Sequence, residues 1–176
     1  MSAVDDFYAS LARTRLGAGA LITDGDGRVL MVEPTYKQTW EIPGGAVERG
    51  EGAPAACVRE VGEELGLTDF DLGRLLVIDH QQDPPPRGDS VMFVYELGLP
   101  DGVMVRLAPD ELRSYAYFHP DELDTITSAR LAGRVRMALA ARSEGVLIES
   151  INGERRRSPA FGSDGRSNRW AGHGHE

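Results

Sequence analysis

The chain is poor in cysteine and in long apolar segments, and each shortage excludes a class of protein. Among 176 residues there is one cysteine, Cys57, which excludes an internal disulfide framework and a zinc site built from several thiolates. The apolar stretches are far shorter than the ~20 residues that span a bilayer. The N-terminus lacks the basic-then-apolar order of a signal peptide. We therefore expect a cytoplasmic protein of one domain.

Positive charge is also scarce. The 19 basic residues face 28 acidic ones, so the formal net charge is −9 at pH 7. A strongly acidic chain lacks the basic surface that nucleic acid or an anionic membrane requires, so we expect neither as a partner. Lys37 is the only lysine, and arginines spread over the whole chain supply the remaining basic residues. We interpret this bias as an effect of codon usage rather than as chemistry.

Turn residues and apolar patterning divide the chain into short strands and two helices. The Asp-Gly repeat at 24–27 predicts a hairpin between extended segments at 15–23 and 28–33. Pro54 suits the first turn of a helix and Gly66 suits its C-terminal cap, which predicts a helix over 54–65. We expect a second helix over 128–142 and further strands at 72–80, 90–97, 103–107, 115–118 and 145–151.

The composition changes near both ends of the chain. Residues 1–14 form a short lead-in, and a single domain is expected over 15–151. From residue 152 the chain is rich in Gly, Ser and Arg and has few residues that could form a core. We therefore predict a mostly disordered tail over 152–176.

Three glutamates gather on one face of the helix predicted over 54–65. Glu60, Glu63 and Glu64 stand at i, i+3 and i+4, and the apolar residues of the helix fall on a different face. Close carboxylates repel one another by a few tenths of a kcal/mol per pair even on an exposed helix. A hard divalent cation such as Mg²⁺ offsets that repulsion, because it prefers oxygen ligands. The alternative is an acidic face that simply meets water.

The residues before this helix favour the metal site. Gly44 and Gly45 end an extended segment and open a loop, where a backbone carbonyl can be presented to a metal. Glu51 lies eight residues before Arg59, so their opposite charges are placed where they could brace the loop against the helix. The alternative is an unconnected loop acid and a surface arginine.

The segment 45–67 resembles a complete Nudix box. That signature consists of Gly, five residues, Glu, seven residues, Arg-Glu, an aliphatic residue, one residue, Glu-Glu, one residue, Gly and an aliphatic residue. Its defined positions are filled by Gly45, Glu51, Arg59, Glu60, Val61, Glu63, Glu64, Gly66 and Leu67. Most of these positions require a fixed residue type, and each such type has a base frequency of roughly 5–10%. The probability of a chance match anywhere in the chain is therefore well below ~10⁻⁵. The resemblance implies an α/β/α sandwich with a mixed, curved sheet, the box helix on one face and 128–142 on the other.

The resemblance also implies a role for each matching position. Glu60, Glu63 and Glu64 would hold Mg²⁺ or Mn²⁺, and Gly44 would offer its backbone carbonyl to the metal. Glu51 and Arg59 would form a structural ion pair.

In proteins of this kind, the residue that activates water lies at one of two places. It is either a box glutamate, here Glu60 or Glu64, or an acid on a later loop. Glu111 is the candidate for such a loop acid because it precedes a predicted strand, and Asp110 is its competitor. A plain turn residue is the alternative for Glu111.

Three residues outside the box are candidates for substrate binding. Trp40 precedes the glycine turn and could stack on a nucleobase, although a core aromatic is an equal alternative. Arg28 and Arg87 are candidates for phosphate contacts, with solvated surface arginines as the alternative.

The resemblance implies a Mg²⁺-dependent pyrophosphohydrolase that cleaves a small nucleoside diphosphate linked to another moiety. ADP-ribose, another nucleotide sugar and a nucleoside triphosphate are all compatible with the sequence. The alternative is a non-catalytic Nudix module that binds a nucleotide as a sensor, which has less need of all three glutamates. The sequence is also compatible with a homodimer.

Overall fold

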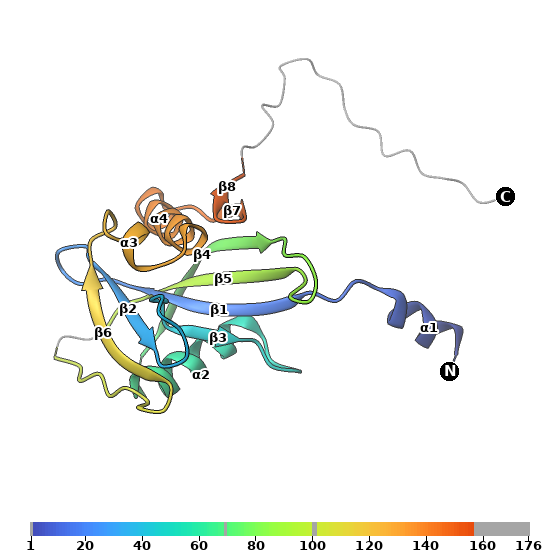
Figure 1. Ribbon diagram of the computed structural model, residues 1–176, viewed down its shortest axis with the longest axis horizontal. Coiled ribbons are helices and arrows are strands. Elements are labelled where there is room, and N and C mark those ends of the chain that lie inside the picture. The colour runs from blue at the N-terminus through green and yellow to red at the C-terminus, as the bar shows by residue number, and fades with distance from the viewer. Residues whose placement is uncertain (1, 69, 100–101, 157–176) are drawn as a thin grey trace, which may run out of the picture.

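The computed structural model describes residues 2–68, 70–99 and 102–156. Its helices are α1 (Ala3–Ser10), α2 (Ala53–Leu65), α3 (Leu123–Ile126) and α4 (Ala129–Glu144). Its strands are β1 (Arg15–Ile22), β2 (Val29–Pro34), β3 (Gly44–Ala46), β4 (Leu72–Gln81), β5 (Ser90–Leu97), β6 (Leu112–Phe118), β7 (Ile148–Ile151) and β8 (Glu154–Arg155). Figure 1 shows these elements gathered into one body, from which α1 projects.

The strands form a mixed sheet and a smaller two-stranded sheet. The larger sheet has the order β3-β1-β5-β4-β7-β8, and the smaller one pairs β2 with β6. Strand β1 is antiparallel to β3 and parallel to β5, and β4 is antiparallel to β5 and parallel to β7. Parallel and antiparallel pairs thus alternate around the centre of the sheet, as the predicted mixed sheet requires.

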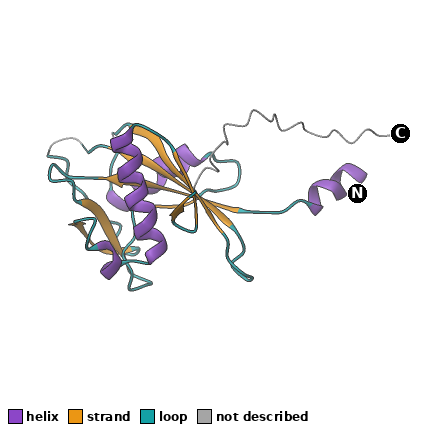
Figure 2. Cartoon of the chain, turned by 90° about the horizontal axis from the view of Figure 1, so that it is seen from above, coloured by secondary structure: helices purple, strands orange, loops and turns teal. Residues whose placement is uncertain are grey.

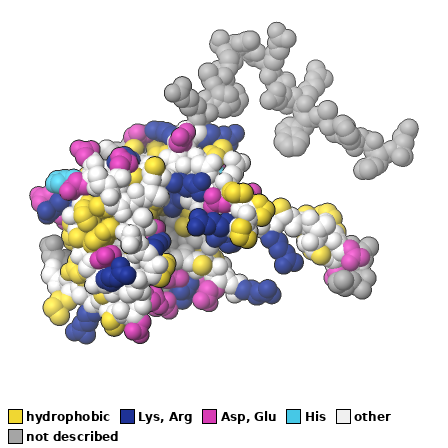
Figure 3. All heavy atoms as spheres, viewed as in Figure 1, with side chains coloured by type: hydrophobic (Ala, Val, Ile, Leu, Met, Phe, Trp, Pro, Cys, Tyr) yellow, Lys and Arg dark blue, Asp and Glu magenta, His cyan; other side chains and the backbone are white. Residues whose placement is uncertain are grey.

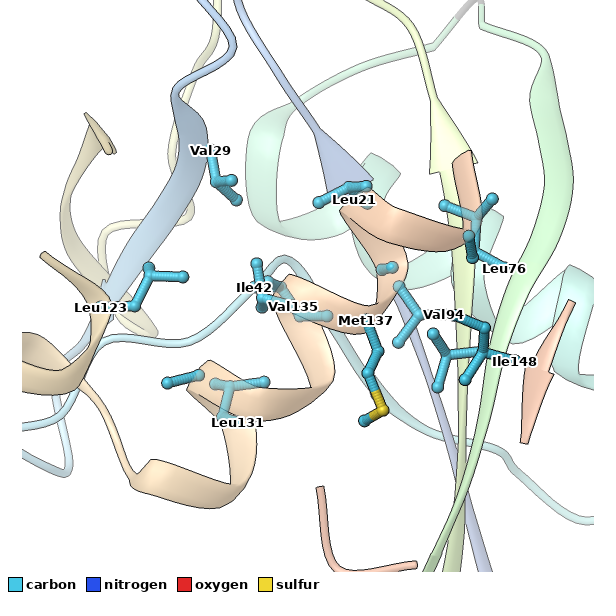
Figure 4. Close-up of a cluster of buried hydrophobic side chains, with 14 of the residues drawn as sticks. Leu21, Val29, Ile42, Leu76, Val94, Leu123, Leu131, Val135, Met137 and Ile148 are labelled. Atoms are coloured by element: carbon cyan, nitrogen blue, oxygen red, sulfur yellow. The ribbon is translucent and has the colours of Figure 1, made fainter. Parts of the chain in front are cut away.

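The two long helices cover opposite faces of the larger sheet. Along β1, Leu21 packs in the cluster around α4, whereas Ala20 and Ile22 pack in the cluster around α2. Successive side chains of a strand point to opposite faces, so the two helices must lie on opposite sides. Figure 4 shows Leu131 and Val135 of α4 among the side chains of the first cluster. This arrangement confirms the predicted α/β/α sandwich.

Helix α2 starts and ends where its sequence indicates. Pro54 occupies its first turn, where a missing N–H costs little, and Gly66 ends it in a left-handed conformation with φ of 65°. The apolar face of α2 is buried, with Ala56, Cys57, Val61 and Leu65 packed toward β1 and its neighbours. Burial raises the pKa of the Cys57 thiol to about 12, as expected of a structural rather than a reactive cysteine.

The hairpin predicted between 15–23 and 28–33 is wrong. The two segments share a single bridge, Thr23 with Val29, and then separate into different sheets. The Asp-Gly turn does reverse the chain, and the side chain of Asp24 caps it by accepting bonds from the backbone N–H groups of Asp26 and Arg28. The turn sequence fixes the reversal, but the pairing is decided by β6, which lies beside β2 along its whole length.

The strand predicted at 103–107 is also absent. This segment instead runs past the C-terminal end of α2, where the N–H of Arg106 donates to the carbonyl of Leu65 at 2.8 Å. The N–H of Ala108 similarly donates to the carbonyl of Glu64 at 3.2 Å. The segment thus satisfies helix carbonyls that have no partner within the helix, rather than extending a sheet.

The folded region extends beyond residue 151, where the sequence places the start of the tail. The chain turns at 152–153 into β8, which pairs with β7, and the N–H of Gly153 donates to the buried carboxylate of Asp79 at 2.9 Å. The predicted tail is therefore wrong for 152–156, and its remainder, 157–176, lies outside the described residues.

Helix α1 lies within the predicted lead-in. Ser2 caps it by accepting a hydrogen bond from the backbone of Asp5, and both views show the helix apart from the rest of the body (Figures 1 and 2). None of the helices in the described ranges combines the length and the apolar character needed to cross a membrane.

Candidate functional site

The site is built where strand β3 meets helix α2. Gly44 crosses β1 so closely that a Cβ at this position would lie 2.3 Å from the carbonyl oxygen of Ala18. Its φ of 144° is also one that residues with a side chain rarely adopt. Only glycine fits, and its N–H then donates to Oε2 of Glu64 at 2.8 Å. The glycine turn therefore fixes the position of one box glutamate.

The carboxyl group of Glu64 is buried. Burial is the largest cause that raises its pKa, to about 7, and the charges of Glu60, Glu111 and Glu41 raise it further. The hydrogen bond from the N–H of Gly44 acts in the opposite direction. Glu64 forms no ion pair within the part of the chain that the structure describes.

Arg59 connects the loop before α2 to the helix. Its Nε and Nη2 each donate to a carboxylate oxygen of Glu51 at 3.1 Å, and Nη2 also donates to the carbonyl of Ala46 at 3.0 Å. These hydrogen bonds lower the pKa of Glu51 and raise that of Arg59. Glu51 in turn accepts the N–H of Glu48 at 3.0 Å, which closes the loop. The two residues that the Nudix box pairs are thus in direct contact.

The same guanidinium holds the other two box glutamates. Nη1 of Arg59 donates to Glu60 at 2.9 Å and to Glu63 at 3.2 Å. The carboxyl of Glu60 lies against Gly45, where a Cβ would approach it to 2.4 Å. The Glu63 side chain is 60% exposed and is the most peripheral of the three. Glu60 and Glu63 therefore share a cationic partner, Arg59, whereas Glu64 has none among the described residues.

The described residues fit a divalent cation through their charge rather than through a preformed cage. Across those residues, no three acidic, histidine or cysteine side chains converge as ready metal ligands. Glu64 is nevertheless buried beside Glu60, Glu111 and Glu41 with a raised pKa. Carboxylate oxygens gathered in this way are the ligands that Mg²⁺ and Mn²⁺ prefer. Glu60 and Glu64 are thus the pair best placed to hold the cation.

Glu64 and Gly44 line a cavity of about 210 Å³. Its wall also includes Lys37 and Glu41, whose Nζ and Oε1 atoms form an ion pair at 2.7 Å. Sequence analysis missed both of these residues as parts of the site. Two signals were present, since Lys37 is the only lysine and Glu41 precedes the glycine turn by three residues.

Glu111 lies on the turn before β6, near enough for its charge to raise the pKa of Glu64. The backbone of Glu111 is anchored, because its carbonyl accepts the N–H of Thr35 at 2.8 Å. The competing acid, Asp110, does not contribute to the pKa shift of Glu64. Of the two acids, only Glu111 is thus among the charges that act on Glu64.

Two of the predicted substrate contacts lie elsewhere. The ring of Trp40 packs edge-on against Phe118 with centroids 4.9 Å apart, at the border of the core cluster around α4. Arg28 pairs with Asp24 at 2.7 Å and with Asp26 at 3.1 Å in the turn between β1 and β2. Trp40 is thus placed as a core aromatic, the alternative stated from the sequence. Arg28 is neither at the cavity nor simply solvated, because two turn carboxylates pair with it. Arg87, in contrast, lines a groove beside the cavity.

Comparison with known proteins gives the same picture. A family model described as NUDIX domain matches residues 13–138. An RNA pyrophosphohydrolase of Sphingopyxis alaskensis is 38% identical over 28% of this chain and 33% of its own length. An ADP-ribose pyrophosphatase of Methanocaldococcus jannaschii is 30% identical over 58% of this chain and 60% of its own length. The chain thus spans between a third and three fifths of these two curated relatives.

A solved structure extends the comparison to the fold. The crystal structure of a MutT NUDIX hydrolase from Burkholderia pseudomallei is 28% identical, with a TM-score of 0.55. The match covers 74% of this chain and 98% of that one. Nearly all of the solved chain therefore has a counterpart here.

Proposed function

The chain belongs to the NUDIX domain family, and on that premise we propose that it hydrolyses a phosphoric anhydride bond with the help of a divalent cation. The observation that carries this proposal is the buried carboxylate of Glu64, which has no cationic partner among the described residues and lies beside further acids. A structural protein gains nothing from such an arrangement, because uncompensated buried charge destabilises the fold. A metal-binding enzyme requires it.

The roles of the residues follow from their contacts. Glu60 and Glu64 would hold the cation, and the N–H of Gly44 keeps the Glu64 carboxylate turned toward β3. Arg59 fixes the loop 46–52 through Glu51 and orients Glu60. Glu63, which is largely exposed, contributes charge from the rim of the site.

The bound cation, Mg²⁺ or Mn²⁺, supplies positive charge to the phosphoryl oxygens and lowers the pKa of water. The proton of the attacking water must then reach a base. We assign that role to Glu111, because it lies on a separate turn within charge range of Glu64 and is not needed as a ligand. A carboxylate that holds the metal is occupied by it, which argues against Glu64 as the base.

The substrate class that fits is a nucleoside diphosphate linked to another moiety. One of the two relatives is named for RNA and the other for ADP-ribose, so the feature that their substrates share is the anhydride bond rather than the attached group. The net charge of −9 and the acids around Glu64 repel a diphosphate at the site, and a cation offsets that repulsion. The metal is therefore expected to strengthen substrate binding as well as to support catalysis.

A nucleotide screen tests this proposal. The purified chain is incubated with nucleotide sugars, nucleoside triphosphates and dinucleoside polyphosphates in Mg²⁺, and phosphate is measured after treatment with a phosphatase. We expect metal-dependent release from at least one anhydride and none from the Glu64→Gln variant. Tight binding of a nucleotide without any turnover would instead support the sensor alternative and overturn the hydrolase.

A further inference from the structure

A second cavity adjoins the site cavity. It has a volume of about 460 Å³ and lies between the loop 82–89 and the start of α4. The two cavities share Lys37, Glu41, Met92, Leu131 and Arg134 as common wall. A ligand held at Glu64 therefore lies next to residues that also line the second cavity.

The walls of the second cavity are basic, although the chain is acidic. Four cationic side chains line it, from three separate parts of the sequence: Lys37, Arg87, Arg130 and Arg134. We call this space the basic groove. Its only acidic lining residues among those described are Glu41 and Asp83. Figure 3 shows Lys and Arg side chains gathered around a hollow on the face in view.

Arg134 is built into the groove rather than lying on its surface. Its side chain is 6% exposed, and its Nε and Nη2 donate to one oxygen of the fully buried Asp79 at 3.0 and 2.9 Å. Asp79 is held in turn by the hydroxyl of Ser150 and the N–H of Gly153. Nη1 of Arg134 has no hydrogen-bond partner among the described residues. The guanidinium is therefore fixed in advance, with donor capacity left toward the groove.

The remaining cations differ in how far they are already neutralised. Arg130 pairs with Asp83 at 3.0 Å, and Lys37 pairs with Glu41 at 2.7 Å. Arg87 is exposed and forms no salt bridge within the part of the chain that the structure describes. Of the four cations, Arg87 is therefore the one whose charge is least neutralised, and an anionic ligand would interact with it most strongly.

The start of α4 adds to the same field. Ser128 caps this helix of 16 residues and lines the groove. The N-terminal end of a helix carries partial positive charge and exposed N–H donors, which favour an anion. The helix end and the four basic side chains thus act in the same direction.

We propose that the basic groove binds a phosphate group of the substrate that lies beyond the scissile anhydride bond. This inference rests on the proposed function and narrows it: the substrate is a nucleotide anhydride whose second moiety carries at least one further phosphate. A neutral sugar or a nucleobase offers Arg87 and Arg134 only uncharged acceptors, which form weaker hydrogen bonds with a guanidinium than an anionic oxygen does. A phosphate satisfies both, because guanidinium groups bind phosphate oxygens in forked geometry.

The first experiment tests the groove without catalysis. Inorganic pyrophosphate is titrated into the protein in EDTA, and binding is followed by calorimetry. Without a divalent cation the acids around Glu64 repel the anion, so the binding that remains reports on the basic groove. We expect saturable binding that is weakened about tenfold or more in Arg87→Ala, since one charge-assisted contact is lost.

Arg87→Ala is the informative variant because Arg87 is exposed and unpaired, whereas Arg134→Ala would leave the buried Asp79 without its partner. Arg74→Ala is the matched control. Arg74 lies at the opposite end of β4 from the loop 82–89, and its loss changes the net charge equally. Absence of saturable pyrophosphate binding, or an equal loss of affinity in both variants, overturns the groove as a phosphate site.

The second experiment tests the substrate class. ADP-ribose and ADP-ribose 1″-phosphate differ only by a phosphate on the distal ribose, and both are assayed with Mg²⁺. We expect the phosphorylated compound to show a KM about tenfold lower at similar kcat, and Arg87→Ala to remove that difference. Equal KM values in the unmodified protein contradict the substrate class. If neither compound is hydrolysed, the proposed function fails for this substrate type while the pyrophosphate titration still decides the groove.

Discussion

The main-chain N–H of Gly44 donates to Oε2 of Glu64 at 2.8 Å, and this one bond joins the glycine turn to the carboxylate helix. Gly44 is tied to β1 on its other side, because no side chain fits between it and Ala18. Glu64 is consequently held by a part of the fold that has little freedom to move. The site is positioned by the sheet as well as by its own helix.

The burial of Glu64 predicts how stability depends on pH in the metal-free protein. Its pKa is raised from 4.5 to about 7, so the folded state favours the protonated form. The stabilisation that the protonated Glu64 contributes to the folded state is therefore fully present below pH 4.5, and it is lost as the pH rises through about 7. The contribution is about 3 kcal/mol, since one pKa unit corresponds to ~1.4 kcal/mol.

Urea unfolding in EDTA near pH 5 and near pH 8 checks this dependence. Glu64→Gln is the matched variant, because its amide oxygen can accept the N–H of Gly44 but cannot ionise. We expect the variant to be the more stable protein near pH 8, while the difference shrinks near pH 5. A difference that is the same at both pH values would contradict the assignment of the raised pKa to Glu64.

The contact between Arg59 and Glu51 predicts a coupled effect on activity. Arg59→Ala leaves Glu51, Glu60 and Glu63 without their shared partner. The loss of folding stability should therefore exceed the ~0–1 kcal/mol that an exposed ion pair contributes. Mg²⁺ activation should weaken and the rate should fall. Adding Glu51→Ala should change the defect little, because paired residues are not additive. If the effects of the two single variants simply multiply, the bracing role is wrong.

Gly45 predicts a local defect in the position of Glu60. A Cβ at Gly45 would lie 2.4 Å from the Glu60 carboxyl, so in Gly45→Ala that flexible side chain must move away. We expect a largely unchanged melting temperature and at least a ~10-fold weaker Mg²⁺ activation, as for other changes that disturb metal ligands. Gly25→Ala is the control, because a Cβ there meets no atom within 4 Å. Unchanged Mg²⁺ activation in Gly45→Ala would show that Glu60 is not a ligand.

The assignment of the base to Glu111 predicts a separation of rate from metal affinity. Glu111→Gln should lower kcat by about 10²-fold or more, in the range that general base catalysis contributes, without changing the Mg²⁺ concentration for half-activation. Asp110→Asn, one residue earlier, is the control and should keep most of its activity. A full effect in Asp110→Asn and none in Glu111→Gln would reverse the assignment.

Much of this site could be predicted because its signals lie close together in the sequence. The limits of α2 follow from Pro54 and Gly66, and the spacing of Glu60, Glu63 and Glu64 places them along one side of that helix. The contact between Glu51 and Arg59 spans only eight residues. Local patterns of this kind depend little on how distant segments pack.

The remainder depends on contacts between distant segments. The Asp-Gly turn predicted the reversal at 24–27 but not that β2 would pair with β6, about 80 residues further along. Trp40 precedes the glycine turn, yet its ring meets Phe118 rather than the cavity. The basic groove joins residues near 37, 87 and 130, which no local pattern connects. These residues meet only because two loops and α4 pack together at one side of the sheet.

The most direct test of the central claim is the binding of Mn²⁺ by the unmodified protein and by Glu64→Gln, measured by electron paramagnetic resonance alongside turnover. The account predicts saturable Mn²⁺ binding by the unmodified protein, with turnover that follows occupancy. Removing a residue that hydrogen-bonds to a metal ligand typically lowers metal affinity ~10–100-fold. Glu64→Gln removes the ligand itself, so its Mn²⁺ affinity should fall by at least that factor, and turnover should fall in parallel. Full Mn²⁺ affinity and full turnover in Glu64→Gln would contradict the account.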